Sequence, residues 1–132
     1  MITNYFEAIK ELISDGTYEY KYGYGKSYDD FKSAHTLGNK EICISYDSGS
    51  VSDEQYESKY DIVEIEDMTI YVKTDSGNNS INDIKKIVRN INEACEFTLS
   101  DERYNIIARD WKPYEQDDKI NTVFQISVEI WM

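Results

Sequence analysis

Residues 80–95 read Ser80-Ile-Asn-Asp-Ile-Lys-Lys-Ile-Val-Arg-Asn-Ile-Asn-Glu-Ala-Cys95, and the spacing of the apolar side chains sets the architecture expected for the chain. Apolar residues recur every three or four positions, which places them on one face of an α-helix. Ser80 is a favourable residue for the helix start, and Asp83 follows in the first turn. The stretch therefore predicts an amphipathic helix that needs an apolar surface. Its apolar positions are Ile81, Ile84, Ile87, Val88, Ile91 and Cys95.

A second helix is predicted near the beginning of the chain. Asn4 and Glu7 have the three-residue spacing of a capping box, and Gly16 supplies a stop. The apolar positions of this segment also repeat at helical spacing. They are Tyr5, Phe6, Ile9, Leu12 and Ile13.

The remaining apolar segments alternate, as strands do. Residues 41–46 form a short strand candidate, and residues 47–57 look like a polar loop. Residues 60–74 predict one long strand, or two strands broken near Glu66 and Asp67, before the turn chemistry of residues 75–79. After the central helix, two alternating segments predict a hairpin whose charged tip is residues 112–119. These segments contain Tyr104, Ile106 and Ala108, and then Phe124, Ile126, Val128 and Ile130.

This order of elements predicts an α+β fold, in which an antiparallel-rich β-sheet is packed on one face by an N-terminal and a central α-helix and the chain closes with a C-terminal β-hairpin. A chain of 132 residues is long enough for one core and too short for two domains of ordinary size. Residues 1–132 are therefore predicted to form a single domain.

The net charge narrows the class of partner. Lys and Arg total 14 and Asp and Glu total 26, which gives a formal charge of −12. Such a field repels phosphate backbones and anionic lipid surfaces, so a general nucleic-acid binder is not expected. No apolar run is long enough to span a bilayer, and no signal peptide is expected. Cys43 and Cys95 are predicted to be reduced and buried in a cytoplasmic product.

The search for chemistry yields no catalytic residue, no cofactor-binding residue and no metal ligand. His35 is the one histidine, and no spacing of Ser, Cys or Asp favours a catalytic triad around it. One histidine and two distant cysteines do not make a zinc site. The Gly25-Lys-Ser27 segment lacks the earlier glycine and the leading strand of a phosphate-binding loop. Residues 47–53 and 75–80 are oxygen-rich, yet neither keeps the calcium-loop pattern. We therefore expect a protein that is not an enzyme.

Surface aromatics are the remaining functional signal. Tyr18, Tyr20, Tyr22 and Tyr24 alternate with polar residues or glycine and would share one side of a strand. Tyrosine and tryptophan are enriched where proteins pack together, so these residues are candidates for a subunit or partner interface. The alternative is that the tyrosines cover the sheet of their own subunit. Trp111 and Trp131 complete the candidate set, since their parity opposite Ile106 and Ile130 predicts a partly apolar second face of the sheet.

The organisation of the chain resembles that of phage tail terminator proteins, also called tail completion or tail-to-head joining proteins. The resemblance is carried by the N-terminal helix, the polar middle that leads into a β-rich segment, the helix from Ser80 to Cys95 and the closing Phe124-Gln-Ile-Ser-Val-Glu-Ile-Trp131 strand. It covers nearly the whole chain, and the family has no catalytic motif.

This resemblance implies a virion structural protein that assembles in the bacterial host cytoplasm. It would form a hexameric ring on the tail tube, end tube polymerisation and dock to the head or neck connector. DNA would pass through the ring without specific binding, and a contractile-tail relative would also contact the sheath protein. No membrane partner is implied.

Two further functions stay open at this stage. One is a neck or head–tail connector protein of the same machine, which is similar in size and also forms rings. The other is a small acidic inhibitor or immunity protein that captures a basic partner at electrostatically assisted rates. These classes differ in assembly, because the inhibitor would be a monomer or dimer and its association rate would fall with salt.

Overall fold

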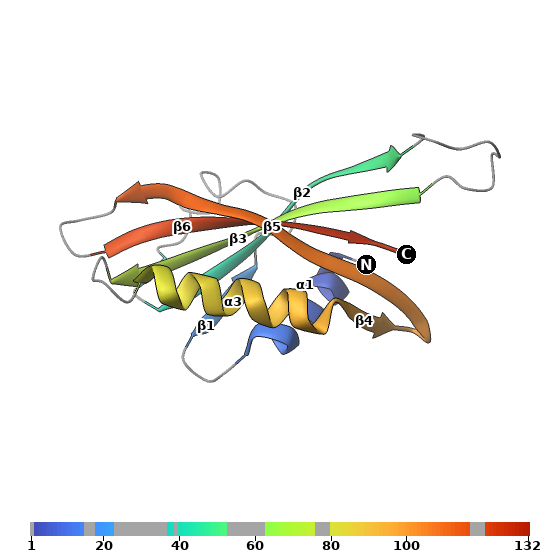
Figure 1. The fold of residues 1–132 in the computed structure, drawn as a ribbon, viewed down its shortest axis with the longest axis horizontal. Helices are drawn as coiled ribbons and strands as arrows, with labels where there is room; N and C mark the ends of the chain where they lie inside the picture. Colours follow the sequence, from blue (N-terminus) through green and yellow to red (C-terminus); the bar gives the residue numbers. More distant parts are fainter. Residues whose placement is uncertain are drawn as a thin grey trace.

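The computed structural model describes residues 2–14, 18–22, 37–38, 40–52, 63–75, 80–116 and 121–132. Figure 1 shows two helices and six strands in these ranges. The predicted α+β class is confirmed, including the two helices and the C-terminal hairpin. In chain order the elements are α1 (Ile2–Ile13), β1 (Glu19–Tyr22), β2 (Glu41–Ser52), β3 (Val63–Asp75), α3 (Ser80–Ala94), β4 (Glu96–Leu99), β5 (Glu102–Gln116) and β6 (Asn121–Trp131).

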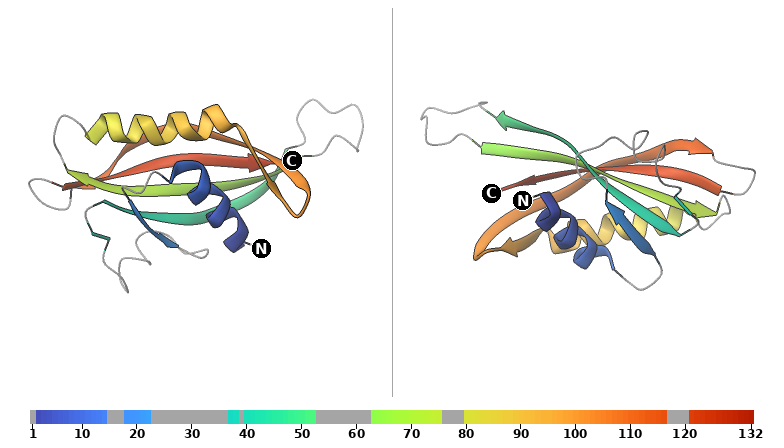
Figure 2. Two further views of the ribbon diagram at one scale, coloured as in Figure 1. Left: turned by 90° about the horizontal axis from the view of Figure 1, so that it is seen from below. Right: turned by 180° about the vertical axis from the view of Figure 1, so that it is seen from behind.

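The six strands form one sheet in the order β1-β2-β3-β6-β5-β4. Only β1 and β2 pair in parallel, and the other neighbours are antiparallel. The last strand, β6, therefore lies between β3 and β5 in the centre of the sheet. The sheet twists strongly and curls around the two helices (Figure 2).

The main core fills the space between the helices and the face of the sheet that they cover. Alternate residues of the central strands point into it, such as Ile70 of β3 and Ile126 of β6, and both are fully buried. The helices contribute most of their predicted apolar stripes. Ile81, which was predicted to lie on the apolar face of the central helix, is instead 49% exposed. The buried members are Phe6, Ile9, Ile13, Ile42, Ile44, Met68, Ile70, Val72, Ile84, Ile87, Val88, Ile91, Ile106, Ala108, Phe124, Ile126, Val128 and Ile130.

The second face of the sheet carries a smaller apolar cluster. It consists of Leu37, Cys43, Tyr71 and Val123, with Tyr114 packed against it. The rings of Tyr71 and Tyr114 meet edge to face, with centroids 5.3 Å apart. The second face is thus partly apolar through this cluster. Trp131 also belongs to this face by strand parity, because it follows the core residue Ile130 and pairs with Ile65 and Asn105.

The expected position of Trp111 on this second face is wrong. The pairing of β5 with β6 shifts between Ala108 and Asp110, so Arg109 is an extra residue and the parity of the following residues is reversed. Trp111 is paired with Ile126, a residue of the main core. Directly paired residues share a face, so Trp111 lies on the helix-covered side, where it is 38% exposed.

The end of α3 corrects two predictions about Cys95. The helix ends at Ala94, and Cys95 adopts a φ of 54°, which directs the chain out of the helix into β4. Cys43 is buried as predicted, but Cys95 is exposed. The strand β4 itself was not predicted. It pairs with β5 through a turn at Ser100 and Asp101, both with positive φ, as in a tight hairpin turn.

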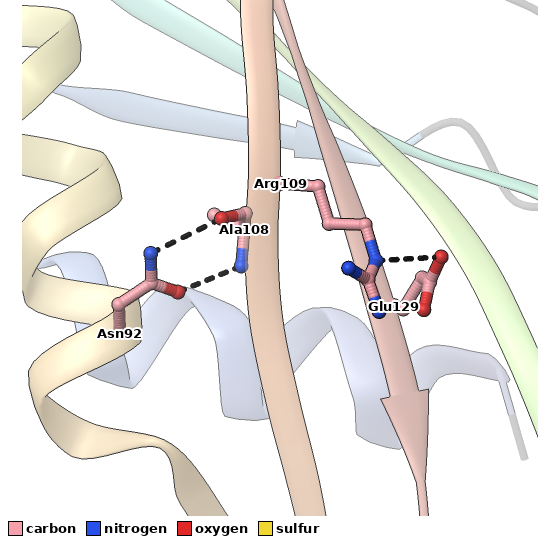
Figure 3. A network of polar contacts seen from close by, with 4 residues as sticks. All are labelled: Asn92, Ala108, Arg109 and Glu129. Carbon is pink, nitrogen blue, oxygen red and sulfur yellow. Dashed lines mark hydrogen bonds and ion pairs between the residues drawn. The ribbon is translucent and has the colours of Figure 1, made fainter.

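The side chain of Asn92 takes the place of a neighbouring strand on the outer edge of β5. Its amide nitrogen donates to the Ala108 carbonyl oxygen at 3.1 Å, and its Oδ1 accepts from the Ala108 amide at 2.8 Å (Figure 3). Strand β4 pairs only with residues 102–105 of β5, so this contact satisfies backbone groups just past the end of β4. It also fastens α3 to the sheet.

Residues 47–52 belong to β2 and are not the predicted loop. The Asp, Ser and Gly residues of this stretch disfavour a strand, but backbone pairing with β3 outweighs that preference. Strand β3 runs through Glu66 and Asp67 without a break. Residues 48–52 of β2 and 63–67 of β3 form an extension, here called the arm, that projects beyond both helices (Figure 1). Strand β6 still pairs with residues 65–67, so the arm is two-stranded only at its outer end, residues 51–52 and 63–64. No helix in the described part of the chain is long and apolar enough to cross a membrane.

Candidate functional site

A pocket of about 440 Å³ opens where the base of the arm meets the start of α1 and the end of β6. Here it is called the aromatic–acidic pocket. Residues from both faces of the sheet form its walls. This is possible at the sheet's end, where β3 extends two residues beyond Ile65, the partner of the last residue of β6. It is lined by Tyr5, Val63, Glu64, Glu66, Tyr104, Ile130, Trp131 and Met132.

The two carboxylates reach the pocket through the alternation of β3. Glu64 and Glu66 have the same parity as Met68, so their side chains leave the strand on the face that bears the main core. The neighbouring strand places Ile130 opposite Glu66 and Trp131 opposite Ile65. The core face therefore changes from apolar to acidic where the cover of the helices ends.

Aromatic rings form the opposite wall. Tyr5 of α1 meets Tyr104 of β5 edge to face, with centroids 5.7 Å apart, and meets Phe97 of β4 at 6.5 Å. Phe97 and Tyr104 are stacked at 5.5 Å with an interplanar angle of 14°. Each such pair contributes about 0.5–1.5 kcal/mol beyond its buried area. The three rings therefore hold one another in position, and two of them, Tyr5 and Tyr104, face the pocket.

The electrostatic surroundings of these tyrosines are negative. Burial, with further contributions from Tyr104, Glu66 and Glu64, raises the pKa of Tyr5 to about 12. The Tyr46 hydroxyl donates a hydrogen bond to Glu66, and this bond, with burial, raises the pKa of Tyr46 to about 12. Within the described ranges, no lysine or arginine lines the pocket or forms an ion pair with Glu64 or Glu66. The described lining of the pocket thus combines aromatic rings and carboxylates without a cation.

A second acidic group lies on the other face of the sheet. Asp67 stands opposite Glu129, and like charges in that relation repel. Burial and the Glu129 charge raise the pKa of Asp67, while Arg109 lowers it. Arg109 leaves the bulge of β5 toward Glu129, and its Nε lies 2.9 Å from a Glu129 oxygen (Figure 3). The charge of this acidic group is therefore partly neutralised by Arg109.

Asp47 belongs to the same side of the sheet. It accepts a hydrogen bond from the Thr69 hydroxyl, and burial raises the pKa of its carboxyl despite that bond. No group of three or more His, Cys, Asp or Glu side chains within the described ranges is arranged to hold a metal ion.

The structure distributes the predicted interface residues over distant places. Tyr18 and Tyr20 are partly buried against the main core, and Lys10 lies over the Tyr20 ring, with Nζ 5.7 Å from its centroid. Tyr22 is the last residue of β1. Trp131 lines the aromatic–acidic pocket, whereas Trp111 stands on β5. Tyr24, His35 and the segment 25–27 lie outside the described residues.

Of the residues that line the pocket, sequence reasoning had named only Trp131 as a site residue. The missed residues with polar or aromatic groups are Tyr5, Glu64, Glu66 and Tyr104. Tyr5 and Tyr104 were assigned only to apolar stripes. The usable signal was in residues 64–72. Every second residue of this strand points toward the main core, and at positions 64, 66, 68, 70 and 72 these residues are Glu, Glu, Met, Ile and Val. Carboxylates at the end of a core face indicate that the cover of the sheet stops there.

No protein-family model matches this chain, and no curated protein matches its sequence.

Proposed function

We propose that this chain is a structural protein of a phage or a phage-tail-like particle, and that it forms a ring which caps the tail tube. The ring ends tube polymerisation and docks to the head or neck connector. The proposal starts from the resemblance of the element order to tail terminator proteins. The N-terminal helix, the central helix and the closing hairpin on which that resemblance depends are present as α1, α3 and β5–β6.

The observation that carries the proposal is the arm. Strands β2 and β3 have 12 and 13 residues, which corresponds to roughly 40 Å at about 3.3 Å per residue. Only the inner part of this length is needed to cover the core. Residues 48–51 are exposed, and Val51 is 58% exposed. A projecting two-stranded ribbon with an apolar side chain at the surface is suited to contact another protein subunit.

A ring also requires two different complementary surfaces on each subunit. Exposed large apolar side chains are found on separate elements, which supplies candidates for both surfaces. Besides Val51 on the arm they are Ile81 at the start of α3, Trp111 on β5 and Met132 at the end of the chain.

The charge of −12 is consistent with the same function. A negative ring repels the phosphate backbone, so a DNA duplex can slide through its opening without being held. A contractile-tail version of the machine would add contacts to the sheath protein.

The test is the solution mass by light scattering, alone and with purified cognate tail tubes, combined with electron microscopy of the tubes. The expected result is a hexamer, or a monomer that becomes a ring only at the tube end. A chain that stays monomeric and leaves tubes uncapped would refute the proposal. A ring that binds the portal and ignores the tube would instead identify the neck protein of the same machine.

A small acidic inhibitor is the second candidate, and the aromatic–acidic pocket is the observation that favours it. Two carboxylates beside aromatic rings suit a basic side chain of a target protein. This function predicts a monomer or dimer whose association rate with a basic nuclease or toxin falls steeply with salt. A salt-independent rate would exclude it.

A further inference from the structure

We propose that the aromatic–acidic pocket of one subunit receives Lys85 and Arg89 from helix α3 of the neighbouring subunit. This inference rests on the proposed ring and identifies the contact that closes it. The contact is heterologous, because the two surfaces lie on different parts of the chain.

The pocket has the chemistry of a cation receptor. Tyr5, Tyr104 and Trp131 line the pocket with aromatic rings, and ammonium and guanidinium groups are attracted to rings of this kind. Glu64 and Glu66 add two carboxylates, which form charge-assisted hydrogen bonds with the same groups. A volume of about 440 Å³ lies within the range of pockets that enclose small ligands or side chains. The pocket therefore matches a pair of basic side chains better than an acidic or neutral segment.

Helix α3 presents the complementary stripe. Ile81, Lys85 and Arg89 follow one another at four-residue spacing, so they share one side of the helix, and all three are exposed. No ion pair or hydrogen bond to Lys85 or Arg89 is found within the described part of the chain. In a chain of charge −12, two adjacent cations without a carboxylate partner are an exception that calls for an external partner.

Most other cations whose side chains the structure describes have a contact within the chain, and Lys86 on the same helix is one of them. Lys10 lies over Tyr20, the Lys73 ammonium donates to the Leu37 carbonyl oxygen, Arg103 faces Glu96, and Arg109 is paired with Glu129. Lys40 and Lys112 are exposed, but they are isolated from each other on different strands or turns. Within the described part of the chain, the α3 stripe is thus the place where two cations that form no ion pair lie one helical turn apart beside an exposed apolar residue.

The match includes apolar surface as well as charge. Ile81 is 49% exposed, and the pocket rim carries Val63 and Met132, the latter 61% exposed. An interface that buries these side chains gains apolar contact, and the two charge pairs fix its register.

The positions of the two surfaces prevent the α3 stripe of a subunit from filling the pocket of the same subunit. They favour contacts that run from each subunit to the next. Helix α3 begins at the end of the molecule opposite the arm and the C-terminus (Figure 1). A subunit that offers its α3 stripe to one neighbour thus keeps its pocket open for another. Repetition of this contact with a closing rotation yields a ring.

Charge reversal with rescue tests the contact. The pocket variant is Glu64→Lys with Glu66→Gln, since glutamine keeps an acceptor for the Tyr46 hydroxyl. The stripe variant is Lys85→Glu with Arg89→Glu. Each variant alone opposes like charges across the contact, so we expect its self-association, measured by light scattering with and without tail tubes, to weaken at least about tenfold or to be lost.

The decisive measurement is the equimolar mixture of the two variants. Each pocket then meets a stripe of opposite charge on the other variant, so rings with alternating subunits are expected to reform. Matched controls change the net charge equally at other exposed sites and should assemble like the wild type. They are Glu11→Lys with Glu93→Gln, and Lys40→Glu with Lys112→Glu. Glu64→Lys alone serves as a second pocket variant if circular dichroism shows that the double variant does not fold.

The outcomes separate this contact from the proposed function. Rescue by mixing supports the contact. Variants that form rings like the wild type overturn the contact and leave the ring function standing. Loss of assembly without rescue also overturns it, because the occupant of the pocket is then not α3. A wild type that forms no ring with or without tubes refutes both.

Discussion

Removal of the Asn92 side chain should loosen the contact between α3 and the edge of β5. Asn92 makes two hydrogen bonds, one to each backbone polar group of Ala108, at 3.1 and 2.8 Å. Each hydrogen bond in a folded protein contributes about 0.5–1.5 kcal/mol net, so the pair contributes about 1–3 kcal/mol. The site is partly buried, and the released backbone groups regain some contact with water. We therefore expect a loss of about 1–2 kcal/mol from these bonds for Asn92→Ala.

Helix propensity acts in the opposite direction and needs a control. Alanine is more favourable than asparagine in a helix interior by up to about 0.7 kcal/mol. Asn90→Ala makes the same substitution two residues earlier in α3, where no hydrogen bond of the side chain is found within the described part of the chain. The difference between the two variants isolates the contact with Ala108.

The assay is urea unfolding followed by circular dichroism, with hydrogen exchange as a local probe. Asn92→Ala should unfold at lower urea than Asn90→Ala, with an unchanged slope. The Ala108 amide should also lose protection, while the amides of β6 keep theirs. A difference in unfolding free energy below about 0.5 kcal/mol would refute the assigned role of Asn92.

Three further predictions follow from burial and from the shifted tyrosines. Ile91→Ala should cost about 2–5 kcal/mol in urea unfolding, because Ile91 is fully buried in the main core, and a loss below about 1 kcal/mol would contradict that packing. A thiol reagent at neutral pH should label Cys95 in the native protein and Cys43 only after unfolding, since burial raises the pKa of the Cys43 thiol to about 12; equal rates would contradict this. Between pH 10 and 12 the free energy of unfolding should fall, because the pKa values of Tyr5 and Tyr46 are near 12 in the folded chain and near 10 in the unfolded chain, which loses these protons first. Urea midpoints measured across this range should fall less steeply for Tyr46→Phe, and identical slopes would count against the Tyr46–Glu66 bond.

The two helices were the most predictable part of the fold. Their apolar residues repeat at a period that is a property of the helix itself, and the start at Ser80 was correct to the residue. Two boundaries differed. Helix α1 begins at Ile2, before the capping box predicted at Asn4 and Glu7, and α3 ends at Ala94 because Cys95 leaves the helix with a positive φ. The closing hairpin was also predictable, since the alternation along β6 and the first part of β5 is a local pattern. Its charged tip was predicted at residues 112–119, but residues 112–116 continue β5.

The polar strands were less predictable, because they depend on a partner. Residues 47–52 have the composition of a loop, and they become strand through pairing with β3. The short strand β4 likewise exists because β5 lies beside it. Backbone hydrogen bonds between strands carry no signature in either segment alone.

The candidate site was almost invisible from the sequence. Trp131 was a candidate, but its neighbours in the pocket come from α1, β3 and β5. Tyr5 and Tyr104 are far apart in the chain, and each is explained locally as part of an apolar stripe. Only Glu64 and Glu66 carried a signal of their own, as charged residues at core parity.

The sequence by itself determined which faces of the helices and of the hairpin strands are apolar, because periodicity depends only on the geometry of each element. The tertiary structure decided that β6 lies between β3 and β5, that a bulge at Arg109 turns Trp111 toward the helix side, and that the arm leaves an acidic, aromatic pocket at its base. The physical reason is that strand order, register and the limit of helix cover are set by contacts between distant segments, and any strand edge can satisfy the same backbone groups.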